Sequence, residues 1–444
     1  MKAQIHLSDK FSYAKLLRFI LPSIIMMIFT SIYGVVDGLF VSNFVGKTQF
    51  AGLNFIMPFL MLLGAFGFMF GAGGNALVSK LLGEGNREKA NKIFSMLVVI
   101  TLLLGATLTV LGWIFIDDFA FLLGAREELL EYSVQYGRII LISLPFFMLQ
   151  LEFQNFFSTA EKPKLGLAIT IGSGVTNMVL DALFIVVFKW GLVGAAIATM
   201  CSEIIGGGVP LIYFASKNKS LLRLVKTRFF GKEFIKTCTN GSSELLTNVS
   251  MSLINMVYNI QLLNLAGENG VAAYGFILYV NFVFISAYIG YSVGSAPITG
   301  YNYGAKNTIE LKNVLKKSLV IIASFSLTVF VLSILLSKPL AMLFVGYDKN
   351  LYDLTVYGFR IFSFSFLLSG FAIYGSSFFT SLNNGVISAI ISFFRTCVFQ
   401  LLAVILLPLV LGVDGIWLSI VVAEFLAVTL NAVFLVKNKK RYGY

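Results

Sequence analysis

Long apolar stretches alternate with short polar segments along the whole 444-residue chain. A bilayer core about 30 Å thick is crossed by roughly 20 apolar helical residues. Twelve stretches reach that length: 15–40, 51–79, 93–116, 130–157, 165–188, 191–214, 236–263, 272–299, 316–337, 351–378, 386–410 and 413–436. The period-2 alternation of membrane barrel strands is absent. The pattern therefore predicts an all-α integral membrane protein with twelve transmembrane helices.

Composition supports this interpretation. Hydrophobic residues make up 58% of the chain and charged residues 12%, whereas about 25% of a soluble domain is charged. The net charge of +12 raises the question of nucleic acid, but the basic residues lie in short clusters between apolar stretches, without any basic recognition module. We therefore expect the lipid bilayer, and no nucleic acid, as the partner of these charges.

The distribution of Lys and Arg predicts an orientation. With the N-terminus inside, 25 of the 33 basic residues fall in cytoplasmic segments and 5 in external ones. The other three, Arg138, Arg360 and Arg395, lie within spans. Because short cytoplasmic loops are enriched in Lys and Arg, we expect a multi-pass plasma-membrane protein with both termini in the cytoplasm.

The two halves of the chain read as copies offset by 221 residues. The matches include turn glycines at the ends of corresponding spans: Gly46 and Gly267, Gly73 and Gly294, Gly83 and Gly304, Gly191 and Gly412. An even number of spans per copy gives parallel repeats, related by an axis along the membrane normal. We expect an N-terminal lobe of residues 1–215, a basic cytoplasmic linker of residues 216–236 and a C-terminal lobe of residues 237–444, with pseudo-two-fold symmetry and a V-shape.

Acidic residues inside the spans require an explanation, because placing a charge at mid-bilayer costs roughly 2.5–3.5 kcal/mol of insertion free energy. Asp37 lies in the first span, and Asn177 and Asp181 are four residues apart on one face of the fifth. Together with Thr199 of the sixth span, these side chains can meet in the outer half of the N-terminal lobe. The oxygen set suits Na⁺, or the carboxylate pair could hold a proton; buried polar groups that join helices are the alternative.

The second half does not repeat this set, since the position equivalent to Asp37 is Tyr258. Other candidates there are Glu244, as a second coupling or substrate carboxylate or a helix-start residue in the wet interface, and Arg395, which needs a counter-charge. Aromatic residues could line a cavity for cationic ligands: Tyr33, Tyr258, Tyr279, Tyr288, Tyr291, Phe153 and Phe156. Pro22 breaks the hydrogen-bond ladder of the first span and is the candidate hinge.

The chain resembles the multidrug and toxic compound extrusion (MATE) family. The resemblance covers nearly all of it and rests on these segments: 34–37 (GVVD), 83–86 (GEGN), 191–196 (GLVGAA) and 297–305 (PITGYNYGA). It implies the V-shaped fold of twelve helices. In the branch that keeps its ion site in the N-terminal lobe, that site matches Asp37, Asn177, Asp181 and Thr199. The chain is therefore similar to the DinF-like or MepA-like branch, while Glu244 is only a loose match to the other branch.

The resemblance implies an antiporter that exports hydrophobic, often cationic, organic compounds in exchange for Na⁺ or H⁺ by alternating access. A flippase for lipid-linked saccharides of similar architecture is the alternative. An enzyme is not expected, because the only histidine, His6, lies in the polar N-terminal tail and Cys201, Cys238 and Cys397 are far apart. We expect no cofactor besides the coupling ion, and a monomer.

Overall fold

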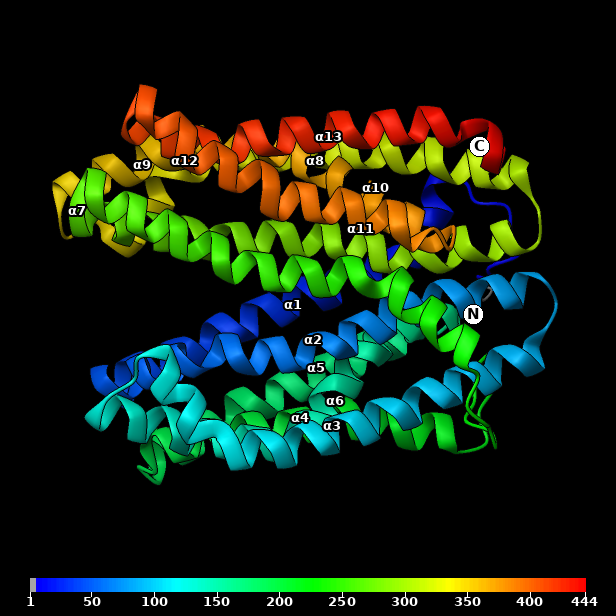
Figure 1. The fold of residues 1–444 in the computed structure, drawn as a ribbon, viewed down its shortest axis with the longest axis horizontal. Helices are drawn as coiled ribbons and strands as arrows, with labels where there is room; N and C mark the ends of the chain where they lie inside the picture. Colours follow the sequence, from blue (N-terminus) through cyan, green and yellow to red (C-terminus); the bar gives the residue numbers. More distant parts are fainter. Residues whose placement is uncertain (1–4) are drawn as a thin grey trace.

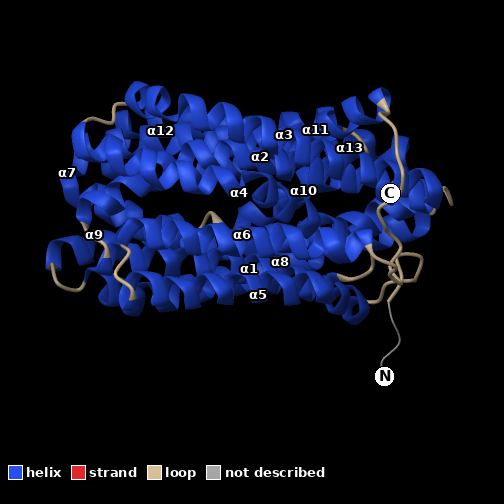
Figure 2. Ribbon diagram, turned by 90° about the horizontal axis from the view of Figure 1, so that it is seen from below, coloured by secondary structure: helices blue, strands red, loops and turns tan. Residues whose placement is uncertain are grey.

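The computed structural model describes residues 5–444, and every regular element in that range is a helix (Figure 2). The elements are α1 (Tyr13–Phe44), α2 (Lys47–Gly83), α3 (Arg87–Leu123), α4 (Glu127–Thr159), α5 (Pro163–Asp181), η1 (Ala182–Val187), α6 (Gly191–Ala215), α7 (Gly231–Gly304), α8 (Thr308–Val345), α9 (Lys349–Ser363), α10 (Phe366–Ser381), α11 (Gly385–Phe393), η2 (Phe394–Phe399), α12 (Gln400–Leu411) and α13 (Val413–Tyr442). The short elements η1 and η2 are π-helical turns that continue α5 and α11.

These elements form the twelve predicted spans. The 74-residue helix α7 has non-helical backbone at Gly267, with φ 63° and ψ −157°. A straight helix of that length would reach roughly 110 Å, far beyond any bilayer, so the break at Gly267 divides α7 into two spans. Helices α9 and α10 form one span with a bend of 47°. The hydrophobic pattern predicted neither this bend nor the two π-helical turns.

The internal repeat is present in the backbone. Left-handed φ angles recur at the 221-residue offset at Gly46 and Gly267, at Gly85 and Lys306, and at Gly191 and Gly412. The side chains of Asn86 and Asn307, another equivalent pair, cap α3 and α8 by accepting from the backbone N–H three residues later. The same capping chemistry therefore begins the third helix of each lobe.

A symmetric seam of small residues joins the lobes. A Cβ on Gly83 of α2 would collide with the carbonyl oxygen of Tyr301 on α7, and a Cβ on Gly304 would collide with that of Lys80. Because Lys80 and Tyr301 are themselves 221 residues apart, the two contacts are equivalent under the pseudo-two-fold axis. Glycine is required at both places to let the two backbones approach this closely.

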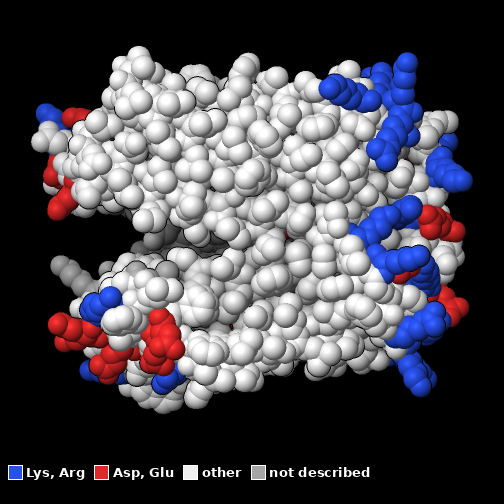
Figure 3. Space-filling model, viewed as in Figure 1, with Lys and Arg blue, Asp and Glu red and all other residues white. Residues whose placement is uncertain are grey.

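The lobes diverge from this seam and leave a cleft. Figure 1 places α1–α6 in one lobe and α7–α13 in the other, with both chain ends at the same end of the molecule. Lys and Arg gather at that end, and the hollow between the lobes opens at the opposite end, where acidic residues predominate (Figure 3). The basic end of the molecule is therefore the end away from the opening of the cleft, and the acidic end is the open one.

The segment between the lobes, residues 216–230, has no helix, and α7 begins at Gly231. It runs along α3: the backbone N–H groups of Arg223 and Val225 donate to Asn91 and Ser95 at 2.9 and 2.8 Å. Polar side chains of α3 therefore satisfy part of the backbone of the linker.

The seam yields a testable prediction. Gly83→Val would force α2 away from α7 and destabilise the closed seam by about 1–3 kcal/mol, the cost of overpacking. Spin labels on Lys164→Cys and Lys312→Cys, with Cys201, Cys238 and Cys397 replaced by serine, should report a longer or broader distance between the lobes. Gly275→Val is the control, because nothing lies within 4 Å of a Cβ there. An unchanged distance in Gly83→Val would contradict the prediction.

Candidate functional site

Four side chains from three helices meet inside the N-terminal lobe. Asp37 of α1 is 8% exposed, while Asn177 and Asp181 of α5 are 1% and 0% exposed. The amide nitrogen of Asn177 donates to the hydroxyl of Thr199 on α6 at 3.4 Å, and the carboxyl groups of Asp37 and Asp181 lie close enough to interact electrostatically. The structure therefore brings together all four residues that the sequence selected.

The pocket has an excess of acceptors over donors. Within the described residues, no donor reaches Oδ1 of Asp37, Oδ1 of Asn177 or either carboxylate oxygen of Asp181. The amide nitrogen of Asn177 donates to Thr199, and its carbonyl oxygen is one of the buried acceptors without a donor. Buried acceptors without donors are rare in folded proteins, and a proton or a cation is what would satisfy this cluster.

The donor set fits a hard monovalent cation. Carboxylate, amide and hydroxyl oxygens are the ligands that such ions prefer. The described part of the chain contains no group of three or more His, Cys, Asp or Glu side chains that could hold a metal, and the four side chains of this pocket offer oxygen and amide groups. The side chains therefore suit Na⁺ or a shared proton rather than a transition metal.

Further polar groups surround the pocket, and sequence reasoning missed some of them. The hydroxyl of Tyr136 on α4 lies beside Thr199. Glu203 of α6 accepts from the hydroxyl of Ser143 at 2.6 Å. The π-helical turn η1 begins immediately after Asp181. Such turns occur often at functional sites.

Glu152 of α4 is a second omission. It is fully buried and accepts from the hydroxyl of Thr101 at 2.5 Å, while its Oε1 has no donor among residues 5–444. The signal was available, because Glu152 lies near the end of the apolar stretch 130–157, close to the polar residues Gln150, Gln154 and Asn155. A carboxylate at that depth meets the same physical criterion that selected Asp37.

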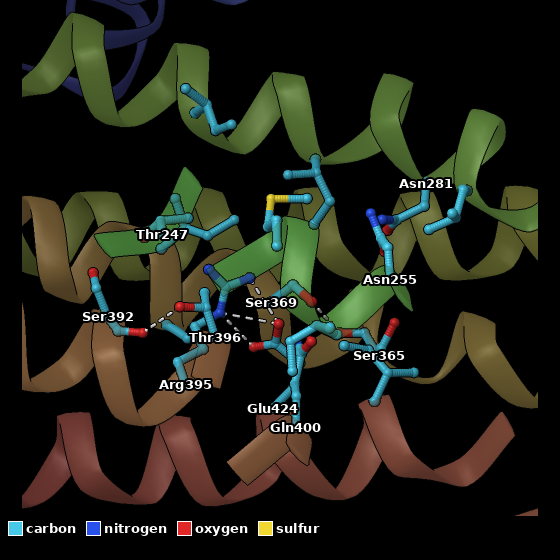
Figure 4. Close-up of a pocket in the computed structure, with 18 of the residues that line it drawn as sticks. Thr247, Asn255, Asn281, Ser365, Ser369, Ser392, Arg395, Thr396, Gln400 and Glu424 are labelled. Atoms are coloured by element: carbon cyan, nitrogen blue, oxygen red, sulfur yellow. Dashed lines mark hydrogen bonds and ion pairs between the residues drawn. The ribbon is translucent and has the colours of Figure 1, made fainter. Parts of the chain in front are cut away.

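The C-terminal lobe contains a separate cavity of about 1020 Å³, its open mouth included. Glu244, Arg395 and Glu424 all line it. Arg395 was expected to need a counter-charge. The structure supplies Glu424, which accepts from Nε and Nη2 of the guanidinium at 2.7–3.0 Å (Figure 4). Arg395 lies in the π-helical turn η2, so each lobe has a π-helical turn next to or at its charged pocket.

The predicted aromatic residues divide into two groups. Tyr258, the equivalent of Asp37, lines the C-terminal cavity and stacks on Tyr274 with ring centres 4.9 Å apart. Tyr33 lies one turn before Asp37 and packs against Gly174 of α5. These two tyrosines face the pockets of their lobes.

The other aromatic residues correct the expectation of a cavity lining. The hydroxyl of Tyr288 donates to the backbone of Phe366, and that of Tyr291 donates to Ser318, so both join helices within the C-terminal lobe. Tyr279 is 49% exposed. Phe153 stacks on Phe214 in a packed aromatic cluster that also contains Phe94 and Phe156. Interhelical packing accounts for Tyr288, Tyr291, Phe153 and Phe156, whereas Tyr279 is not packed in the interior.

Helix α1 combines a proline with a loosely packed outer half. Pro22 is buried beside the seam, where a Cβ on Gly290 of α7 would meet the backbone of Ser23. Nothing lies within 4 Å of a Cβ built on Gly34 or Gly38, which flank Asp37. The segment that carries Asp37 therefore has room to move relative to a firmly packed base.

The buried ion pair yields a second prediction. Arg395→Gln would leave Glu424, whose side chain is 1% exposed, without its counter-charge, and should lower the free energy of unfolding in mixed micelles by about 3–5 kcal/mol. Adding Glu424→Gln should restore most of that loss. The matched control is Arg138→Gln, whose pair with Asp117 is exposed (42% and 52%) and should contribute less than about 1 kcal/mol. Equal losses for both arginines would contradict the prediction.

Comparison with known proteins places the chain in a family. The sequence profile of the MatE family matches residues 22–183 and again residues 245–406, once in each lobe. The multidrug export protein MepA of Staphylococcus haemolyticus is 27% identical over 96% of this chain and 93% of its own length. MepA of Staphylococcus aureus strain MSSA476 is 22% identical over 96% and 94%.

Solved structures share the fold. An outward-facing multidrug resistance MATE family transporter of the MOP superfamily has a TM-score of 0.92 at 22% identity, over 98% of this chain and 97% of that one. Crystal structures of MATE in the straight and bent conformations give 0.90 and 0.88 at 23% and 22% identity, over 98% of this chain and 97% and 98% of theirs. With the repeated match of the family profile, these findings show that the chain is a MATE-family transporter of the MepA-like kind.

Proposed function

We propose that the protein is a secondary antiporter that exports hydrophobic, often cationic, organic compounds in exchange for Na⁺ or H⁺. One observation carries the proposal: two buried carboxylates from different helices face each other, with four acceptor oxygens in their pocket that no donor reaches. Two close carboxylates cannot both stay ionised cheaply without a cation. An ion from one side of the membrane therefore has a binding site that is coupled to the position of α1.

The family supports a transporter rather than an enzyme. The curated relatives are named multidrug export proteins, and one similar fold is that of a multidrug resistance transporter. We carry multidrug export to this chain as part of the proposal. The substrate would be an organic compound small enough to enter the cleft between the lobes.

The direction of transport follows from the charge distribution. If the basic end faces the cytoplasm, as short basic loops do, both termini are cytoplasmic and the cleft opens outward (Figure 3). The glycine seam then closes the cytoplasmic side. The conformation would be the one in which substrate leaves and the coupling ion enters.

Coupling requires that ion and substrate prefer different conformations. Cation or proton binding removes the repulsion between Asp37 and Asp181 and draws α1 towards α5. The outer half of α1 can follow because Gly34 and Gly38 have no close neighbours, while Pro22 lacks the N–H that would stiffen the helix. Movement of α1 changes the inner wall of the N-terminal lobe and so disfavours bound substrate.

The alternative, a flippase for lipid-linked saccharides, receives less support from the cavity. A pyrophosphate group needs several free cations in one cavity, but Arg395 is the only arginine among the described residues that line the C-terminal cavity, and one side of its guanidinium is taken by Glu424. Arg138 pairs with Asp117 and Arg360 donates to Ser337 elsewhere. The free carboxylate of Glu244 would also repel it. A vesicle assay that compares dye efflux with lipid translocation separates the two functions.

A third prediction concerns the coupling carboxylates. Asp37→Asn and Asp181→Asn should each lower ion-driven dye efflux from vesicles by about tenfold or more, in the range of measured coupling energies. Asp117→Asn, an exposed carboxylate outside the pocket, should leave efflux near the wild-type rate. Near-normal efflux in both pocket variants would remove the proposed mechanism. Separately imposed Na⁺ and H⁺ gradients in the wild type identify the ion.

A fourth prediction concerns the hinge. Pro22→Ala restores a backbone hydrogen bond in α1 and stiffens the helix, so the maximal efflux rate should fall a few-fold while dye affinity in detergent stays unchanged. Pro58→Ala, inside α2, is the matched control and should retain the wild-type rate. A rate in Pro22→Ala equal to that of the control would exclude Pro22 as the hinge.

A further inference from the structure

Within the described residues, the guanidinium of Arg395 has a hydrogen-bond partner on only one of its two sides. Glu424 occupies its Nε edge, accepting from Nε and Nη2, and no acceptor within residues 5–444 takes a hydrogen from Nη1. The five N–H groups of an arginine form two forks, each able to hold a carboxylate. The side chain of Arg395 is 14% exposed and that of Glu424 is 1% exposed. The fork formed by Nη1 and Nη2 is therefore the part of the pair that can reach a ligand in the cavity.

Glu244 supplies an opposite charge in the same cavity. Its carboxylate has no hydrogen-bond donor and no ion-pair partner within 4 Å in the described chain, and Arg395 is the one charge that acts on it noticeably. Glu244 also lines a smaller adjoining cavity with Asn75 and Asn155 of the N-terminal lobe. It therefore lies where the two lobes meet, in the wall of the cavity that Arg395 also lines.

The rest of the wall suits a polar, partly aromatic molecule. Figure 4 shows hydroxyl and amide side chains around the guanidinium, and the residues that line the cavity include Thr247, Asn255, Asn281, Ser369 and Gln400. The stacked pair of Tyr258 and Tyr274 forms a flat surface within the lining. Such a wall combines hydrogen bonding with ring stacking.

We propose that this cavity is a binding site for zwitterionic organic solutes. A cationic group of the solute pairs with Glu244, and its carboxylate takes the free fork of Arg395, while Glu424 holds the guanidinium in place from behind. The inference rests on the proposed function, since the solute would be the exported substrate. It names residues that the coupling pocket around Asp37 does not use.

A site for simple cations would be built differently. An arginine that faces the cavity repels a cation and so lowers affinity for it, and a buried ion pair costs stability that an apolar pair of similar volume would not. The exposed fork next to an unpaired carboxylate favours a ligand that carries both charges. The pair of opposite charges thus selects between solutes of equal size.

The experiment measures equilibrium binding to the purified full chain in detergent. The probes are a zwitterionic rhodamine, which has a free carboxylate, and the methyl ester of the same dye, which is a cation. Arg395→Gln combined with Glu424→Gln should weaken binding of the zwitterion by about tenfold or more, the effect of losing a charged hydrogen-bonded pair. Binding of the ester should stay within about twofold, and Glu244→Gln should weaken both dyes.

Equal weakening of the two dyes in the double variant, or no weakening of the zwitterion, would overturn the proposal. Arg395→Lys is measured in parallel, because it keeps a positive charge beside Glu424 but loses the planar fork. Arg395→Lys should also bind the zwitterionic dye more weakly than the wild type does. If the double variant does not fold, this result tests the role of the Arg395 fork. The melting temperature and the affinity for the methyl ester show whether each variant is folded.

Binding and transport are tested separately. Asp37→Asn should lose ion-driven efflux in vesicles and should change the affinity for both dyes in detergent by the same factor, because it alters the conformational equilibrium and not the groups that bind the dye. If the wild type proved independent of both ions, the antiport proposal would fail while the dye pair would still decide the binding site. If Asp37→Asn lost the zwitterion alone, the assignment of the carboxylate to Arg395 would be wrong.

Discussion

The structure depends on one electrostatic constraint, which is that carboxylates buried at membrane depth must be neutralised. Asp37 and Asp181 lie 8% and 0% exposed without donors on most of their oxygens, in a medium where an unpaired charge is costly. In the proposed function, a proton or a cation supplies this neutralisation in the N-terminal lobe. An arrangement that is stable only with a proton or cation is also one whose conformation can respond to that ion.

The C-terminal lobe meets the same constraint in another way. Glu203 and Glu424 are equivalent under the repeat, yet Glu203 accepts from the hydroxyl of Ser143, whereas Glu424 is paired with Arg395. Arg395 occurs at the position of Gly174 in the first half. A permanent counter-charge neutralises Glu424 without an ion and leaves Glu244 as the unpaired carboxylate among the described residues of that cavity. The repeat thus provides two similar frameworks with different electrostatics.

Movement between the lobes is constrained by packing. Equivalent glycines at positions 83 and 304 let α2 and α7 approach along a seam of backbone contacts. This seam is stable without large side chains. It has to separate if the cleft is to open at the basic end. The firm base and loose outer half of α1 connect this seam with the pocket around Asp37. Interfaces of small residues in lipid gain stability from close packing rather than from the hydrophobic effect.

The sequence by itself determined the features that follow from local periodicity. The lengths of the apolar stretches predicted the twelve spans, and the 221-residue repeat predicted two similar lobes whose turn glycines recur in the backbone. The spacing of Asn177 and Asp181 placed them on one helix face. The charged side chains of the pocket were identifiable because a carboxylate within an apolar stretch is conspicuous whatever its neighbours.

Only the tertiary structure decided which helix faces meet. Arg395 and Glu424 are 29 residues apart on different helices, so no local pattern pairs them, and the bend between α9 and α10 follows from packing rather than from a proline or glycine at the break. Tyr258 lines a cavity while Tyr288 and Tyr291 bind neighbouring helices, although all three are tyrosines in apolar stretches. Helical periodicity specifies the direction of a side chain from its own axis, and the crossing of the helices specifies what it contacts.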